Sequence, residues 1–143
     1  MKIKKEVFEQ ISIIANREIC ETGGILGSSE SEIVTDIVPD LHDKTQASRF
    51  EYHPNILFLN EEIKKWSQQN IEFLGMFHIH FIGSCNLSQA DICYIESIMN
   101  SLKGEVEFLY FPIYVLPCNE LYVYKAYFKK DEIIICKDEL EFV

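Results

Sequence analysis

The segment from Ile71 to His80 places the strongest constraint on how this chain can fold. Both alternating faces of the segment are apolar, unlike a strand at a surface, where only one face is apolar. Two apolar faces are typical of a strand at the centre of a sheet that other elements cover on both sides. The sequence therefore predicts a central strand over residues 71–80 inside a layered fold.

Helical and strand-like patterns surround this segment. Three stretches carry the apolar spacing of amphipathic helices: Met1 to about Cys20, residues 55–70 and residues 88–102. Six short β-rich runs predict further strands: 25–28, 32–38, 48–52, 106–116, 121–128 and 133–136. Residues 39–47 are polar and predict a loop. Helices that alternate with hairpin-like strand pairs predict an α/β sandwich with a mixed sheet.

Length and charge limit the class of protein. The chain has 143 residues, 48% of them hydrophobic, which suits a single globular domain over residues 1–143. Its net charge of -10 disfavours binding to nucleic acid or to an anionic membrane, since both partners are negatively charged. No apolar run approaches the ~20 residues of a membrane span.

The cysteines indicate a reducing compartment. There are five, an odd number, and no two form a C-x-x-C pair. The amino-terminal segment has lysines but lacks the apolar core of a signal peptide. We therefore expect reduced thiols in a cytoplasmic protein.

His78 and His80 stand at the end of the predicted central strand. Side chains two positions apart on a strand point to the same face, so both imidazoles can reach one metal ion. The alternative is a pair of core histidines, which would be costly without hydrogen-bond partners. His42 and His53 have no motif around them, and we expect them to be surface or loop residues.

Asp91 has two compatible interpretations. It stands three residues after Ser88 at the start of a predicted helix, where a serine cap and an acidic residue form a capping-box-like turn. The same position could bring its carboxylate to the two histidines. Two histidines and one carboxylate leave an open position on zinc for water, the pattern of a catalytic site. Bound zinc lowers the pKa of that water to about 7.

A hydrolytic zinc site also needs a group that takes up and returns a proton. Glu21 can supply it from the segment Glu-Thr-Gly-Gly-Ile-Leu-Gly over residues 21–27. On its own, this glutamate would be interpreted as a solvated residue beside flexible glycines.

Taken together, these residues resemble the JAMM metalloproteases of the MPN-domain family, whose motif is Glu followed by His-x-His-x10-Asp with Ser-x-x-Asp at its end. The chain looks like a minimal bacterial-type member. The resemblance implies an MPN-like sandwich with a curved mixed sheet and about three helices. It implies one zinc ion per chain on His78, His80 and Asp91, with Glu21 as general base and Ser88 as donor to the oxyanion. It also implies cleavage at the C-terminal tail of a ubiquitin-like or sulfur-carrier protein.

The chain departs from the common family pattern in the loop after the histidines. Ile79 and Phe81 replace a frequent Ser and Pro, and Leu87 replaces a Pro before the motif serine. None of these positions supplies a ligand, but they affect the shape of the loop over residues 81–87. Cys85 in this loop is either a bystander thiol, a fourth ligand or a redox brake on the zinc.

Two other functions fit the same residues. A catalytically silent MPN-type scaffold would bind partners and purify with much less than one equivalent of zinc. A zinc hydrolase of small amides would have a closed pocket in place of an open groove. The sequence leaves open the substrate, the type of bond cleaved and the oligomeric state.

Overall fold

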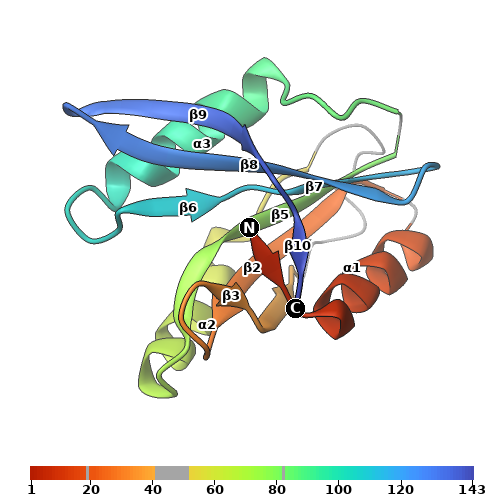
Figure 1. The fold of residues 1–143 in the computed structure, drawn as a ribbon, viewed down its shortest axis with the longest axis horizontal. Helices are drawn as coiled ribbons and strands as arrows, with labels where there is room; N and C mark the ends of the chain where they lie inside the picture. The colour runs from red at the N-terminus through yellow and green to blue at the C-terminus, as the bar shows by residue number, and fades with distance from the viewer. Residues whose placement is uncertain (19, 41–51, 82) are drawn as a thin grey trace.

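A computed structural model describes residues 1–18, 20–40, 52–81 and 83–143 (Figure 1). The elements in chain order are β1 (Lys2–Ile3), α1 (Lys5–Arg17), β2 (Thr22–Ser28), β3 (Ile33–Val34), β4 (Asp36–Pro39), α2 (Ile56–Gln68), β5 (Glu72–His80), α3 (Gln89–Ser101), β6 (Phe108–Tyr110), β7 (Ile113–Val115), β8 (Glu120–Lys129), β9 (Glu132–Asp138) and β10 (Glu141–Phe142). These α and β elements confirm the predicted α/β class with a mixed sheet.

Strand β5 lies inside the main sheet, as predicted from its two apolar faces. It pairs antiparallel with β2 on one side and parallel with both β6 and β7 on the other. The sheet continues from β2 to β4 and from β6 and β7 through β8 to β9. Because parallel and antiparallel pairs occur side by side, the sheet is mixed.

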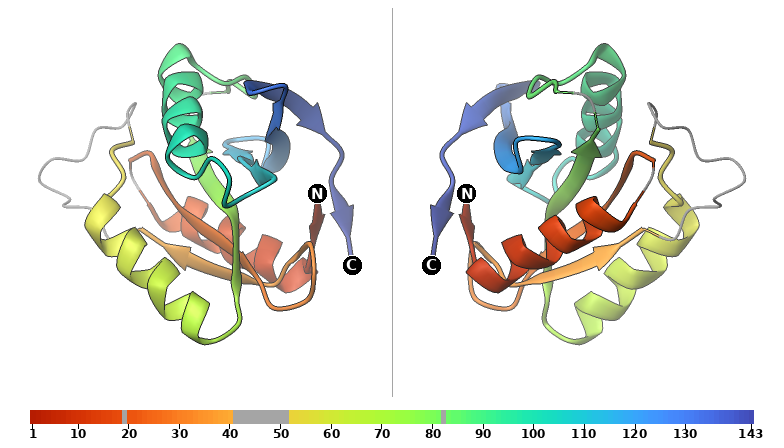
Figure 2. Two further views of the ribbon diagram at one scale, coloured as in Figure 1. Left: turned by 90° about the vertical axis from the view of Figure 1, so that its left-hand side faces the viewer. Right: turned by 90° about the vertical axis from the view of Figure 1, so that its right-hand side faces the viewer.

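Helices cover both faces of this sheet (Figure 2). On one face, Val7 and Ile11 of α1 pack in a core with Phe77 and Ile79 of β5. On the other face, α2 and α3 form a second core, which includes Met76 of β5. The alternation along β5 thus sends Phe77 and Ile79 toward α1. It leaves Met76, His78 and His80 on the face between α2 and α3.

The helices on this second face begin at side-chain caps. The Asn55 side chain accepts a hydrogen bond from the Phe58 amide at 3.2 Å at the start of α2. Ser88 caps α3 in the same way and completes a capping box with Asp91. Such caps satisfy amides that have no partner within the helix. Both helix starts therefore have defined positions beside the end of β5.

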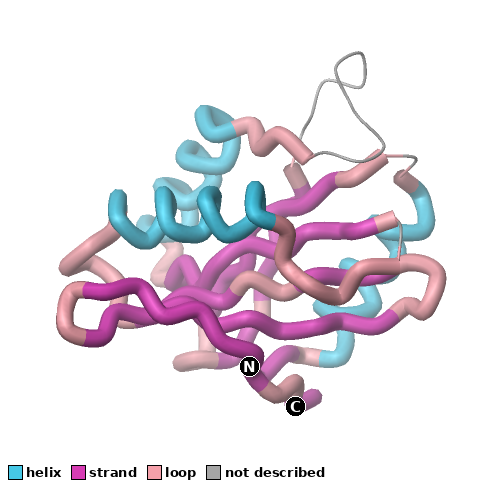
Figure 3. The backbone as a smooth tube through the Cα atoms, turned by 90° about the horizontal axis from the view of Figure 1, so that it is seen from above, coloured by secondary structure: helices cyan, strands magenta, loops and turns pink. Residues whose placement is uncertain are grey.

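The ends of the chain correct one prediction. The first residues form β1 before α1 begins, whereas the sequence predicts a helix from Met1. Strand β1 pairs in parallel with β3 and with β10, so the two termini lie side by side (Figures 1 and 3). Helical periodicity is a local signal, and it carries no information about strand partners more than 100 residues away.

Two predicted strands are interrupted. The predicted strand 106–116 divides into β6 and β7 around Pro112, which has no amide proton for the ladder. The Pro112 carbonyl instead accepts a hydrogen bond from the His78 amide at 3.0 Å. The predicted strand 32–38 divides at Thr35, whose amide donates to the Gly27 carbonyl. The predicted strand 48–52 falls almost wholly outside the described residues, and Tyr52 itself is not in a strand.

The structure bears on two further expectations. No disulfide joins the five cysteines within the described chain. Across the same residues, none of the helices has both the length and the apolar character needed to cross a membrane.

Candidate metal centre

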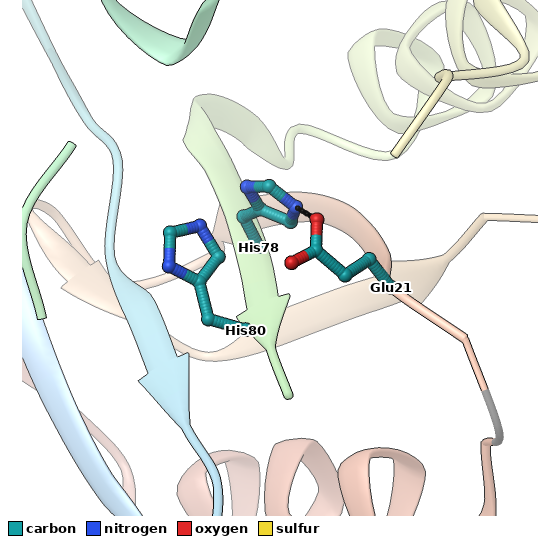
Figure 4. A group of neighbouring side chains, drawn as sticks. All are labelled: Glu21, His78 and His80. Carbon is teal, nitrogen blue, oxygen red and sulfur yellow. Dashed lines mark ion pairs between the residues drawn. The ribbon is translucent and has the colours of Figure 1, made fainter. Parts of the chain in front are cut away.

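His78 and His80 lie together at the end of β5. Their ring centroids are 4.5 Å apart, with one ring edge directed at the other. The strand is held in place by β2 and β7, which pair with it at Gly23 and Ile113 opposite His78. Figure 4 shows both imidazoles projecting from the same side of the strand, with Glu21 beside them. This is the convergence that a spacing of two residues on a strand predicts.

A hydrogen bond at Nδ1 of His80 shows that its other ring nitrogen, Nε2, is available to a metal ion. The Nδ1 atom lies 2.9 Å from the Ser84 carbonyl oxygen. A carbonyl only accepts, so Nδ1 carries the proton and Nε2 has the lone pair. A hydrogen bond of this kind commonly orients a metal-binding histidine. The Nε2 atom is 3.7 Å from Asp91 Oδ2, beyond hydrogen-bond distance.

His78 lies between two carboxylates. Its Nε2 is 3.3 Å from Glu21 Oε2, and its Nδ1 is 3.2 Å from Asp91 Oδ1. The Nε2 atom is buried and makes no hydrogen bond of acceptable geometry with the described residues. Burying an unsatisfied nitrogen is costly, so a bonding partner for this atom would stabilise the site.

Asp91 forms the predicted capping turn and also lies beside the two histidines. Its Oδ2 accepts hydrogen bonds from the Ser88 amide and hydroxyl, each at 2.7 Å, and its own amide donates to Ser88 Oγ at 3.1 Å. This capping box begins α3. The same turn brings the Asp91 carboxylate to within 4 Å of both histidines. The Ser88 hydroxyl proton is directed at Asp91 here.

Glu21 groups with the two histidines as a metal ligand would, although its predicted role is that of a general base. Ligand atoms of Glu21, His78 and His80 all lie within 4.8 Å of one another. The predicted trio of His78, His80 and Asp91 does not form such a group in the described chain, although an Asp91 oxygen lies within 4 Å of each histidine. The two imidazoles therefore face a carboxylate on each side.

Solved structures with similar folds are known. The chain superimposes on a Desulfitobacterium hafniense protein determined in solution with a TM-score of 0.67 and 19% identity, covering 99% of this chain and 93% of that one. An Archaeoglobus fulgidus JAB1/MPN domain protein gives a TM-score of 0.57 at 20% identity, with 100% and 99% covered. A JAMM structure, described as a metalloprotease-like zinc site in the proteasome and signalosome, gives 0.56 at 18%, with 100% and 97% covered. No protein-family model and no curated protein sequence matches the chain.

The chain has a JAMM/MPN fold. This agrees with the family that the motif residues resemble, and it also agrees with the predicted sandwich. Glu21, His78 and His80 form a candidate metal site at the end of β5 in this fold.

In this JAMM/MPN fold, His78 and Asp91 each shift the pKa of the other. Burial lowers the pKa of His78, but the nearby carboxylates of Asp91 and Glu21 outweigh it and leave the pKa raised. Burial also opposes the ionisation of Asp91, yet hydrogen bonds from His78 and Ser88 hold its pKa well below the usual value. The two carboxylates therefore favour the charged form of His78.

The donor set of this site suits a metal ion. Two imidazole nitrogens and carboxylate oxygens are common zinc ligands. The unsatisfied His78 Nε2 and the His80 Nε2 lone pair need a cation or a proton. The residues present therefore fit a metal ion of the zinc type.

A cavity of about 600 Å³ opens beside the two histidines. Apolar side chains from β5, α3 and β7 make up much of its lining: Met76, Tyr94, Ile95 and Ile113. Pro54 and Ile56 contribute from the start of α2. The volume is in the range of small-molecule pockets. The site thus combines convergent polar groups with an adjacent apolar space.

The remaining sequence candidates lie around or outside this site. His53 is an exposed loop residue that lines the cavity, whereas His42 falls outside the described residues. Cys85 is absent from the metal-ligating group of the described chain, and its carbonyl accepts a hydrogen bond from the Tyr124 hydroxyl at 2.8 Å. Sequence analysis missed Tyr52, which packs against His78, because no motif surrounds it.

Proposed function

We propose that this protein is a zinc-dependent peptidase or isopeptidase that cleaves at the C-terminal tail of a ubiquitin-like or sulfur-carrier protein. One observation carries the proposal. His78 and His80 converge between Glu21 and Asp91 and line a cavity, in a JAMM/MPN fold. When bound, a zinc ion there would acidify a water molecule and polarise the scissile carbonyl.

In this proposal, His78, His80 and Asp91 hold the metal. Asp91 suits a ligand because the helix cap holds its Oδ2 and leaves Oδ1 beside His78. His80 suits a ligand because the Ser84 carbonyl fixes its ring with Nε2 free. A rigid donor loses little conformational entropy on binding an ion, which favours these residues over a mobile group.

Glu21 would act as the general base and then as the general acid. Among the described residues its carboxylate makes one ion pair, with His78, so it can exchange a proton without breaking a network. A base must stand within hydrogen-bond reach of the proton that it takes. Its place beside the imidazoles satisfies this condition.

Ser88 would have two roles. It fixes Asp91 through the helix cap, and its hydroxyl would turn from Asp91 to donate a hydrogen bond to the oxyanion of the substrate. A donor of this kind typically contributes about 3–4 kcal/mol to transition-state stabilisation. The hydrogen bond from the Ser88 backbone amide to Asp91 Oδ2 would persist during that rotation.

The edge of the sheet supports a protein substrate with an extended tail. Strand β4 forms the edge next to β2, and its last residue pairs with Gly24, three residues after Glu21. An extended peptide can add to such an edge through backbone hydrogen bonds. This would bring a tail toward Glu21 and the histidines.

The test is cleavage of defined substrates. Zinc-loaded protein would be incubated with ubiquitin-like proteins that carry a Gly-Gly tail, joined to a partner by a peptide or an isopeptide bond, and the products weighed by mass spectrometry. We expect cleavage after the tail and none with Glu21→Ala. Stoichiometric zinc without cleavage of any tail would reject the protease function. Much less than one equivalent of zinc, again without cleavage, would favour a silent scaffold.

The cavity supports a second candidate, a zinc hydrolase that acts on small amides. Its volume of about 600 Å³ and its apolar lining suit a small molecule better than a narrow Gly-Gly tail. Small acyl amides with aliphatic or aromatic groups test this alternative in the same assay. Turnover of these amides with no cleavage of protein tails would decide for it.

A further inference from the structure

Asp40, which directly follows β4, is a buried carboxylate outside the motif. The residue is 6% exposed. Its Oδ2 accepts hydrogen bonds from the Tyr52 hydroxyl at 2.6 Å and from the Asn55 amide at 2.8 Å, while Oδ1 has no hydrogen-bond partner in the described chain. A buried charge with an unsatisfied oxygen is costly. The hydrogen bonds by which Asp40 anchors Tyr52 and Asn55 can offset this cost.

The Tyr52 ring lies against His78. Their ring centroids are 5.2 Å apart and the planes are tilted by 39°. Gly23 on β2 makes room for this ring, because a Cβ atom there would lie 2.7 Å from Tyr52 Cε1. The tyrosine is thus confined between β2 and the imidazole, with its hydroxyl tied to Asp40.

The two histidines differ in what orients them. His80 has a backbone partner, the Ser84 carbonyl, on the nitrogen that does not face the site. Among the described residues His78 has no such partner, since both its nitrogens face carboxylates of the site itself. A metal-binding histidine usually takes its orientation from a hydrogen bond outside the ligand set. For His78, ring packing is the available substitute.

We infer that Tyr52, anchored by Asp40, is a positioning residue that holds the His78 imidazole for metal binding. The inference rests on the proposed metal centre and not on the protease activity. Removing the ring would let His78 rotate away from the ion, and removing only the hydroxyl would loosen the ring. Neither residue contacts the reacting atoms in this account.

The test measures zinc affinity by competition with a chromophoric chelator and unfolding temperature by calorimetry. We expect Tyr52→Ala to weaken zinc binding about 10-fold or more. Losses of this size are typical when a residue that orients a metal ligand is removed. Tyr52→Phe keeps the ring and should lose less. Asp40→Asn combined with Tyr52→Phe should lose no more than the larger single change, since both act through one hydrogen bond.

Tyr114→Phe is the matched control. Tyr114 is also buried and donates a hydrogen bond to Ser12 at 2.8 Å, but it belongs to the core on the α1 face. It should lower the unfolding temperature and leave zinc affinity unchanged.

Wild-type zinc affinity in Tyr52→Ala would overturn the inference. If that variant fails to fold, wild-type affinity in both Tyr52→Phe and Asp40→Asn would overturn it equally. Failure of the unmodified protein to bind zinc would instead overturn the metal centre of the proposed function.

Discussion

Ser88 and Asp91 are joined by reciprocal hydrogen bonds that serve a helix and a candidate metal ligand together. The Ser88 hydroxyl donates to Asp91 Oδ2 at 2.7 Å and accepts from the Asp91 amide at 3.1 Å. The other Asp91 oxygen lies 3.2 Å from His78 Nδ1. The start of α3 and the position of this carboxylate therefore depend on one serine.

Replacing Ser88 with alanine should affect both stability and metal binding. Loss of the cap should lower the free energy of unfolding by about 1 kcal/mol. Zinc affinity should also fall, because Asp91 loses a hydrogen bond that fixes it. Asn55→Ala is the control, since Asn55 caps α2 and should cost similar stability without a loss of affinity. Urea denaturation and zinc titration measure the two effects, and equal zinc affinities in all three proteins would contradict the coupling.

Replacing Glu21 with alanine should separate metal binding from turnover. We expect one equivalent of zinc to remain bound, while the rate of amide cleavage falls by about 100- to 10,000-fold, the range for loss of a general base. Metal content by mass spectrometry and a cleavage assay measure these outcomes. Glu9→Gln, on the opposite helix α1, should leave both values unchanged. Loss of the metal in Glu21→Ala would mean that Glu21 is itself a ligand, as its closeness to both histidines allows.

Removing the metal should abolish activity and lower stability. An ion that binds only the folded state stabilises it by about 2.7 kcal/mol at a free concentration of 100 times Kd. Treatment with a chelator should therefore lower the unfolding temperature, and added zinc should restore both the temperature and the turnover. His80→Ala and Asp91→Ala should not respond to added zinc. Hydrolysis that survives complete chelation would rule out the metal mechanism.

The metal-free protein should show a defined dependence of stability on pH. Asp91 has a lowered pKa in the folded protein, so its contribution is present above the unfolded value of about 4 and is lost as pH falls through the folded value. His78 has a raised pKa, so its contribution is present below about pH 6.5 and is lost as pH rises through the folded value. Stability should therefore be greatest between these limits.

Urea denaturation of chelated protein across this range checks the expectation. Asp91→Asn should flatten the acid side of the profile, because the altered group no longer titrates. An acid limb as steep as that of the unmodified protein would show that other carboxyl groups control it. Asp131→Asn, at an exposed position, serves as the control.

Much of the site was predictable because its signals are local. A strand places residues two apart on one face, so the pairing of His78 with His80 follows from their spacing. The capping turn of Ser88 and Asp91 is likewise contained within four residues. The double apolar face of residues 71–80 similarly predicted the internal strand β5. Each of these inferences needs only the neighbouring residues.

Other features required partners that are distant in the sequence. The pairing of β1 with β10 joins segments more than 100 residues apart, so no local pattern predicts it.

The sequence by itself determined the residue types of the site, their local geometry and the sandwich that carries them. Only the tertiary structure decided that Glu21 lies against His78, that Tyr52 packs on the same ring and that an apolar cavity adjoins them. The reason is physical. Periodicity and capping act over a few residues, whereas these contacts arise when β2, β5 and the start of α2 pack together in three dimensions.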